Sequence, residues 1–147
     1  MNKPLVSWRV WEIKDEKLLS IVNSSCWKSG KAYSSHVDAY YGINNIYQNG
    51  IHSWKTKEQA FDYFILWFTA YFNDSWCFGE LYSWGKIIEH EFGYRSEFAY
   101  PKKLYAENQE LAQKLQNFYG CEIEIYTPPK RINPELIKER EYLNECI

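Results

Sequence analysis

The span from Gly79 to Tyr105 holds the residues whose types and spacing are best suited to chemistry. Glu89, His90 and Glu91 follow one another in a strand-like run, so strand alternation sends both carboxylates to one face and the imidazole to the other. Two carboxylates in one cleft repel each other, so one keeps its proton and the pair can act as general acid and base. The alternative is a solvated sheet face with ion-paired carboxylates and a hydrogen-bonded, half-buried His90.

Arg95 offers a second kind of chemistry, because a guanidinium can hold a carboxylate or a phosphate through two parallel hydrogen bonds. The other reading is an ion pair between Arg95 and a neighbouring glutamate. Aromatic residues before and after Arg95 provide stacking surface for a ligand. The residues that we predict to bind a ligand are Trp84, Glu89, His90, Tyr94, Arg95 and Tyr100.

The histidines His36, His52 and His90 offer three imidazoles for a metal, or one imidazole to activate Cys26 or Ser35 as a nucleophile. Their spacing matches no metal-binding or hydrolase motif. No glycine-rich phosphate loop or dinucleotide-binding motif is present either. We therefore expect no metal, no cofactor and no catalytic residue, which favours a protein that is not an enzyme and leaves enzymatic activity open.

Aromatic residues make up 19% of the 147 residues, with 7 Trp and 13 Tyr. Such side chains line pockets and interfaces, and they also fill sheet-based cores in place of Leu and Val, so both readings stay open. A chain of this length buries roughly two thirds of its unfolded surface, which indicates one compact core. The formal net charge of −2 creates no field for general binding to duplex nucleic acid.

The first residues of the chain lack the apolar region of a secretory signal, and no apolar run reaches the roughly 18 residues of a membrane span. The four cysteines lie far apart, without a Cys-x-x-Cys pair. Reduced, scattered thiols are typical of an intracellular protein. We therefore expect a cytoplasmic protein that does not bind membranes.

The elements that position the candidate residues follow from the hydrophobic pattern. Leu5 to Ile13 alternates with apolar residues on both faces, which predicts a strand covered on both sides. Leu18 to Val22 is either a second strand or a single helical turn. Residues 23–49 are rich in Ser, Gly, Asn and Tyr, which favours turns and irregular structure.

Two helices are predicted from their apolar stripes and end signals. The first runs from Lys57 to Phe72, where Thr56 and Gln59 match a capping box. The second runs from Asn108 to Tyr119, with Gly120 at the position where a C-terminal glycine is expected. Both stripes are those of helices that pack on a sheet.

Three strand-like runs lie between these helices, at Phe78 to Trp84, Lys86 to Phe92 and Tyr94 to Tyr100. Gly85 and Gly93 separate them and allow a bulge or a turn with positive φ. Consecutive antiparallel strands are therefore expected.

Pro101 is expected to end this meander, and residues 121–126 to form a final strand. The sequence thus predicts an α+β fold with a curved antiparallel sheet of about five or six strands, or a partly closed barrel. Two main helices cover the sheet. Residues 1–127 form one globular domain, and residues 128–147 form a Pro-led charged tail with a short C-terminal helix from Asn133.

The span also carries an ordered series of short sequence matches, which are Trp84-Gly85, Glu89-His90, Gly93-Tyr94-Arg95 and Ala99-Tyr100-Pro101. In this series the chain resembles a group of small, uncharacterised bacterial and phage-type proteins. The resemblance covers under a third of the chain and implies no activity. Members often carry closely spaced cysteines before a Gly-Ile pair, whereas this chain has residues 38–41, Asp-Ala-Tyr-Tyr, before Gly42 and Ile43. The resemblance therefore implies no metal role at this position.

These observations favour a recognition module that binds a base, a nucleotide-like small molecule or a short single-stranded segment by stacking and directional polar contacts. The near-neutral charge favours a small ligand. The alternative is a protein-interaction or inhibitor protein, because Tyr and Trp are enriched at interface hot spots, and the resemblance to phage-type proteins extends this to host defence. A third hypothesis is a small hydrolase with Glu89 or Glu91 as base, assisted by His36 or His90.

Overall fold

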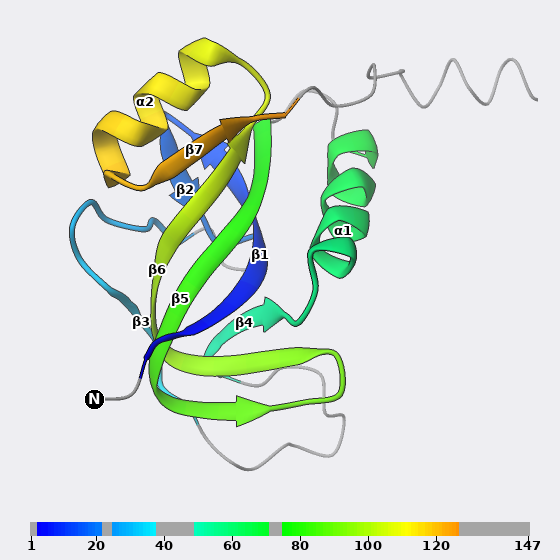
Figure 1. Cartoon of the computed structure of the whole chain (residues 1–147), viewed down its shortest axis with the longest axis vertical. Helices are drawn as coiled ribbons and strands as arrows, with labels where there is room; N and C mark the ends of the chain where they lie inside the picture. The colour runs from blue at the N-terminus through cyan, green and yellow to red at the C-terminus, as the bar shows by residue number, and fades with distance from the viewer. Residues whose placement is uncertain (1–2, 22–24, 38–48, 71–74, 127–147) are drawn as a thin grey trace, which may run out of the picture.

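The computed structural model describes residues 3–21, 25–37, 49–70 and 75–126. Within these ranges the chain is an α+β protein, in which seven strands form one mixed sheet and two helices pack on it (Figure 1). The predicted α+β class with two main helices is confirmed. The elements are, in chain order, β1 (Leu5–Lys14), β2 (Lys17–Leu19), β3 (Tyr33–Ser34), β4 (Ile51–Trp54), α1 (Lys57–Ala70), β5 (Ser75–Glu89), β6 (Gly93–Ala106), α2 (Gln109–Tyr119) and β7 (Glu122–Ile125).

The strands β1, β5 and β6 form the centre of the sheet, and the two helices cover its opposite faces. β1 runs antiparallel to β5, and β5 runs antiparallel to β6. Side chains alternate along β1, so Val10 belongs to the buried cluster that contains Phe64 of α1, whereas Trp11 belongs to the one that contains Leu115 of α2. β1 is therefore covered on both faces, as its two-sided apolar pattern predicts.

The prediction of three short strands after α1 is wrong, because two long strands take their place. Gly85 has a φ of 78° and lies inside β5, where the register with β6 shifts between Trp84 and Ile87. The glycine therefore makes a bulge within one strand instead of a turn between two. As Figure 1 shows, β5 and β6 continue past this point as one hairpin, which bends away from α2 and passes below β4 on the side of α1.

Pro101 does not end the strand that carries it, since β6 continues to Ala106. Leu81 pairs with Pro101 and Glu80 pairs with Lys103, so Lys102 is an extra residue on β6. A proline lacks the N–H that a regular ladder needs, and a bulge is one of the positions where a sheet tolerates it. The register shift thus explains how the strand passes through the proline.

The sheet is partly ringed and does not form a closed barrel. β4 pairs with β6 along four residues and reaches β1 through the single pair Trp8 and Trp54. β1, β5, β6 and β4 therefore surround a small interior, in which the Ser7 hydroxyl donates to the buried Ser53 hydroxyl at 2.7 Å. β7 runs parallel to β6, so the sheet is mixed and not wholly antiparallel. The crossover through α2 produces this orientation.

Both helices begin close to the predicted residues, and α2 ends at the predicted Tyr119, whereas the predicted end of the first helix at Phe72 lies outside the described residues. At α1 the Gln59 N–H donates to Thr56 Oγ1 at 3.2 Å, and the Thr56 N–H donates to Gln59 Oε1 at 3.0 Å. At α2 the Leu111 N–H donates to Asn108 Oδ1 at 2.8 Å. Gly120 ends α2 with a φ of 69°, in the left-handed region. These ends depend on contacts within a few residues, which a sequence reveals.

The remaining elements resolve what the sequence left open. The segment at Leu18 is a strand, β2, which pairs with β1, and not a helical turn. The final strand is present as β7, while β4 was not predicted. The described part of residues 23–49 is mostly irregular and contains β3. The positions at residues 38–43, the tail at 128–147 and its predicted helix lie outside the described residues.

Candidate functional site

The six residues predicted to bind a ligand lie along the β5–β6 hairpin, in four separate places. Arg95 and His90 form the first. Arg95 is 1% exposed, and its Nε–H donates to His90 Nε2 at 3.0 Å. Its Nη1 donates to the backbone oxygen of Asn49 at 2.9 Å. Burial and the nearby Arg95 guanidinium lower the pKa of His90 below its ordinary value, which keeps the imidazole neutral as an acceptor.

The second place holds Glu89 and Tyr94, which are paired across the hairpin. Lys55 joins them, because its Nζ lies 3.2 Å from Glu89 Oε2 and 5.5 Å from the centre of the Tyr94 ring. β5 ends at Glu89, so Glu91 lies in the turn that follows, outside any strand. The strand alternation expected for Glu89, His90 and Glu91 therefore does not apply.

Trp84 and Tyr100 occupy further positions with other partners. Trp84 stacks on Phe98, with ring centres 6.0 Å apart, and is 38% exposed. The Tyr100 hydroxyl donates to the Tyr119 backbone oxygen and accepts from the Gly30 N–H, at 2.8 Å each. Tyr100 thus ties a loop to the end of α2. The contacts among the six predicted residues join Arg95 to His90 and Glu89 to Tyr94, while Trp84 and Tyr100 lie elsewhere, and their role in binding stays a prediction.

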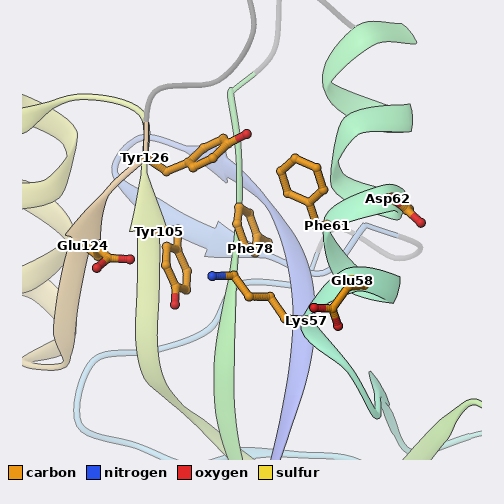
Figure 2. Close-up of a pocket in the computed structure, with 8 residues that line it drawn as sticks. All are labelled: Lys57, Glu58, Phe61, Asp62, Phe78, Tyr105, Glu124 and Tyr126. Carbon is orange, nitrogen blue, oxygen red and sulfur yellow. The ribbon is translucent and has the colours of Figure 1, made fainter.

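A pocket of about 350 Å³ lies in another part of the molecule, where the first turns of α1 face β5, β6 and the end of β7 (Figure 2). This volume falls at the lower end of the range for small-molecule sites. It is lined by aromatic and charged side chains, which are Lys57, Glu58, Phe61, Asp62, Phe78, Tyr105, Glu124 and Tyr126.

Four aromatic rings form the floor and two walls of this pocket. Phe78 and Tyr105 are paired across β5 and β6, and their parallel rings lie 4.8 Å apart at an angle of 3°. Phe61 of α1 and Tyr126 after β7 are half-buried, and their rings meet at 83° with centres 5.7 Å apart. These two half-buried rings therefore supply aromatic surface to the pocket beside the buried Phe78 and Tyr105.

The chain positions these rings through backbone pairing and helix geometry. The Tyr126 N–H donates to the Ala106 oxygen at 2.7 Å, which continues the β6–β7 ladder and brings Tyr126 to the pocket. Phe61 lies four residues after Lys57 on α1, so both are on one side of the helix. Parts of four elements thus meet at the pocket.

Charged groups surround the aromatic rings. The Lys57 Nζ lies 4.7 Å from the centre of Tyr105 and 5.9 Å from that of Trp8. The Lys103 Nζ lies 5.2 Å from the centre of Tyr105, on the outside of the lining. Both ammonium groups are therefore within cation–π distance of the same ring.

Sequence reasoning did not find this pocket. Phe61 belongs to a broad apolar stripe that indicates core packing, and Tyr105 lies after the proline that was expected to end the strand. The available signal was the spacing of Lys57, Phe61 and Asp62 on α1, which places charges beside an aromatic ring. This spacing does not indicate a pocket by itself, because the other walls come from β5, β6 and β7, whose pairing the spacing does not reveal.

In the part of the chain that the structure describes, no group of three or more His, Cys, Asp or Glu side chains is arranged to hold a metal ion. In the same residues, no helix has the length and apolar character needed to cross a bilayer. Comparison with protein-family models, curated proteins and solved structures found no match to this chain.

Proposed function

We propose that this protein is a recognition module that binds a base or a nucleotide-like small molecule in the pocket between α1 and β7. The observation that carries the proposal is the aromatic corner of Phe61 and Tyr126 above the parallel rings of Phe78 and Tyr105. Every base has a flat face that can stack on such a ring, with a contribution of roughly 1 to 3 kcal/mol.

The size of the pocket supports a single small ligand over a longer single-stranded segment. A volume of about 350 Å³ accommodates one base with its sugar, and the pocket is bounded by α1 on one side and β7 on the other. The near-neutral net charge of the chain agrees with this choice, since a long polyanion requires a field of positive charge.

Polar groups at the mouth of the pocket supply directional contacts. Lys57 is exposed and can donate from its ammonium to a ring nitrogen or a carbonyl oxygen of the ligand. Glu58 and Glu124 are exposed acceptors on either side of it. Hydrogen bonds between these groups and the edge of a planar ligand would thus fix the orientation of the ligand on the aromatic corner.

The substitution Phe61→Leu tests this proposal, because it removes the ring and keeps an apolar side chain. The matched control is Tyr63→Leu, which alters a half-buried aromatic on the same helix that packs on Trp54 and Trp67 instead. With adenosine as the probe, calorimetric titration should show binding weakened roughly tenfold in Phe61→Leu and unchanged in Tyr63→Leu. Thermal unfolding of both variants checks that they remain folded.

Two results would contradict the proposal. If the wild-type protein binds no base, nucleoside or nucleotide, the pocket has another role. If both variants bind as the wild type does, the ligand does not use the aromatic corner.

A second candidate function, protein interaction, is supported by an exposed apolar patch on the sheet. Val6 and Tyr82 are paired across β1 and β5, and Trp84 follows two residues later on the same strand. These side chains are 43%, 37% and 38% exposed, respectively. Exposed aromatic residues that cluster in this way are frequent at protein interfaces.

A further inference from the structure

The charges around the pocket identify the class of ligand more closely. We infer that the pocket takes an uncharged base or nucleoside with an exocyclic amino group, and that it excludes phosphorylated nucleotides. This inference rests on the proposed function, because it names the ligand class of the same pocket.

Carboxylates outnumber ammonium groups at the pocket. The lining contains the carboxylates of Glu58, Asp62 and Glu124 and the ammonium of Lys57, and the carboxylate of Asp62 is directed away from the rings (Figure 2). Lys103 lies outside the lining, and the carboxylate of Glu122, 3.8 Å from its Nζ, offsets its positive charge, so the carboxylates remain in excess. A phosphate group brought to this site meets net repulsion, whereas an uncharged ligand does not.

The start of α1 lies at the pocket, and the N-terminal end of a helix is where proteins often bind phosphate. Here the capping box already uses the amides of Thr56 and Gln59. Glu58 adds a carboxylate in the first turn, where the helix dipole stabilises negative charge. The chain itself therefore supplies the negative charge that a phosphate would otherwise supply.

The polar groups match the edge of an amino-bearing base. Figure 2 shows the ammonium of Lys57 beside Tyr105, with Glu58 on α1 and Glu124 on β7 to either side. A carboxylate can only accept hydrogen bonds, so it selects a ligand that donates, as the exocyclic amine of a base does. Lys57 can only donate, so it selects a ring nitrogen or a carbonyl oxygen. Adenine, cytosine and guanine carry both kinds of group.

The deciding experiment compares three probes by calorimetric titration of the full-length protein, at low and at physiological ionic strength. Adenosine carries the amino group, inosine replaces it with a carbonyl, and adenosine monophosphate adds the phosphate. Inosine should bind about fivefold or more weakly than adenosine, because a carboxylate then faces an acceptor. Adenosine monophosphate should also bind about fivefold or more weakly at low ionic strength, and salt should narrow that gap.

Charge-neutral variants assign these differences to the pocket. The double substitution Glu58→Gln with Glu124→Gln should bring the affinity for the phosphorylated probe close to that for adenosine. The control Glu91→Gln removes an exposed carboxylate in the hairpin turn. It should leave the difference in affinity between adenosine and adenosine monophosphate unchanged.

The outcomes separate this inference from the proposed function. If adenosine monophosphate binds more tightly than adenosine, or inosine binds equally well, the inference is overturned while the recognition of a base stands. If none of the three probes binds, the proposed function and the inference both fail.

Discussion

Arg95 and His90 show how burial changes what a reactive side chain can do. A guanidinium between two tyrosines in the sequence has both charge and stacking surface at hand. In the structure it is 1% exposed and donates to His90 and Asn49. The guanidinium of Arg95 thus uses these hydrogen bonds to hold the hairpin against neighbouring residues, and does not offer them to a ligand. Residue type indicates a chemical capacity, and burial decides where that capacity is directed.

The bond between Arg95 and His90 predicts a pH dependence of stability. His90 accepts through Nε2, so a protonated imidazole cannot keep this bond, and its folded-state pKa lies below the ordinary value of about 6.5. The unfolded state therefore binds the proton first as the pH falls. The stabilisation from the Arg95–His90 bond is therefore fully present above a pH of about 6.5 and is lost as the pH falls from there through the folded-state pKa of His90.

Denaturant unfolding across this range checks the prediction in wild type and His90→Gln. Glutamine can accept from the Arg95 Nε–H without titrating, so the variant should lose less stability than the wild type between neutral and mildly acidic pH. His36 and His52 are present in both proteins, so their contributions cancel. Equal losses in the two proteins would show that the His90 imidazole does not control this dependence.

At the scale of elements, Gly85 and Pro101 misled the prediction of strand ends. Gly85 was expected to separate two strands and instead makes a bulge inside β5, and Pro101 was expected to end a strand that continues to Ala106. Both residues permit a turn, but neither requires one. The pairing of β5 with β6 over a long interface favours continued strands, and the bulges absorb the two residues.

Gly85→Ala should therefore destabilise the protein by about 1 to 2 kcal/mol. A Cβ at this position would lie 2.6 Å from Glu97 Oε1 and 2.7 Å from Phe98 Cδ2, and the φ of 78° disfavours any side chain. Gly30→Ala is the matched control, since its φ of 64° carries a similar penalty and a Cβ there meets nothing within 4 Å. Denaturant unfolding compares the two variants.

The difference in the free energy of unfolding between these two variants measures how much the packing of the bulge against β6 contributes. If Gly30→Ala costs as much as Gly85→Ala, backbone conformation alone explains the effect. The contacts with Glu97 and Phe98 would then have no measurable role.

At the scale of the whole molecule, α1 covers only part of one sheet face. Trp76 and Phe78 are buried beneath it, while Tyr82 and Trp84 on the same strand are exposed. The pocket lies at one border of α1, and the exposed apolar patch lies farther along β5. The described residues therefore present two separate surfaces that we propose for recognition, one concave and one on the open sheet.

The exposed patch predicts that Trp84→Ser abolishes a protein contact without unfolding the chain. Affinity capture from host lysate would compare the wild type, Trp84→Ser and the control Phe92→Ser, which alters a 58% exposed aromatic in the hairpin turn. A specific partner should be lost in Trp84→Ser alone, because its indole is the largest exposed group of the patch. Retention of that partner by Trp84→Ser would exclude the patch as its binding surface.

The sequence by itself determined the features that depend on neighbours a few residues away. The capping box at Thr56 and Gln59, the end of α2 at Gly120 and the two-sided pattern of β1 were all read correctly, and with them the α+β class. Helix ends and strand alternation are local properties, so a one-dimensional pattern contains them.

Only the tertiary structure decided which side chains meet. Phe61, Phe78, Tyr105 and Tyr126 come from four segments of the chain, and the sheet register and the placement of α1 bring them into one pocket. The same long-range pairing buries Arg95 and separates Trp84 from Tyr100. Strand pairing depends on contacts between residues far apart in sequence, which local composition does not encode. The sequence thus indicated a chain rich in aromatic and charged side chains, and the fold determined which of them line the pocket that we propose as a binding site.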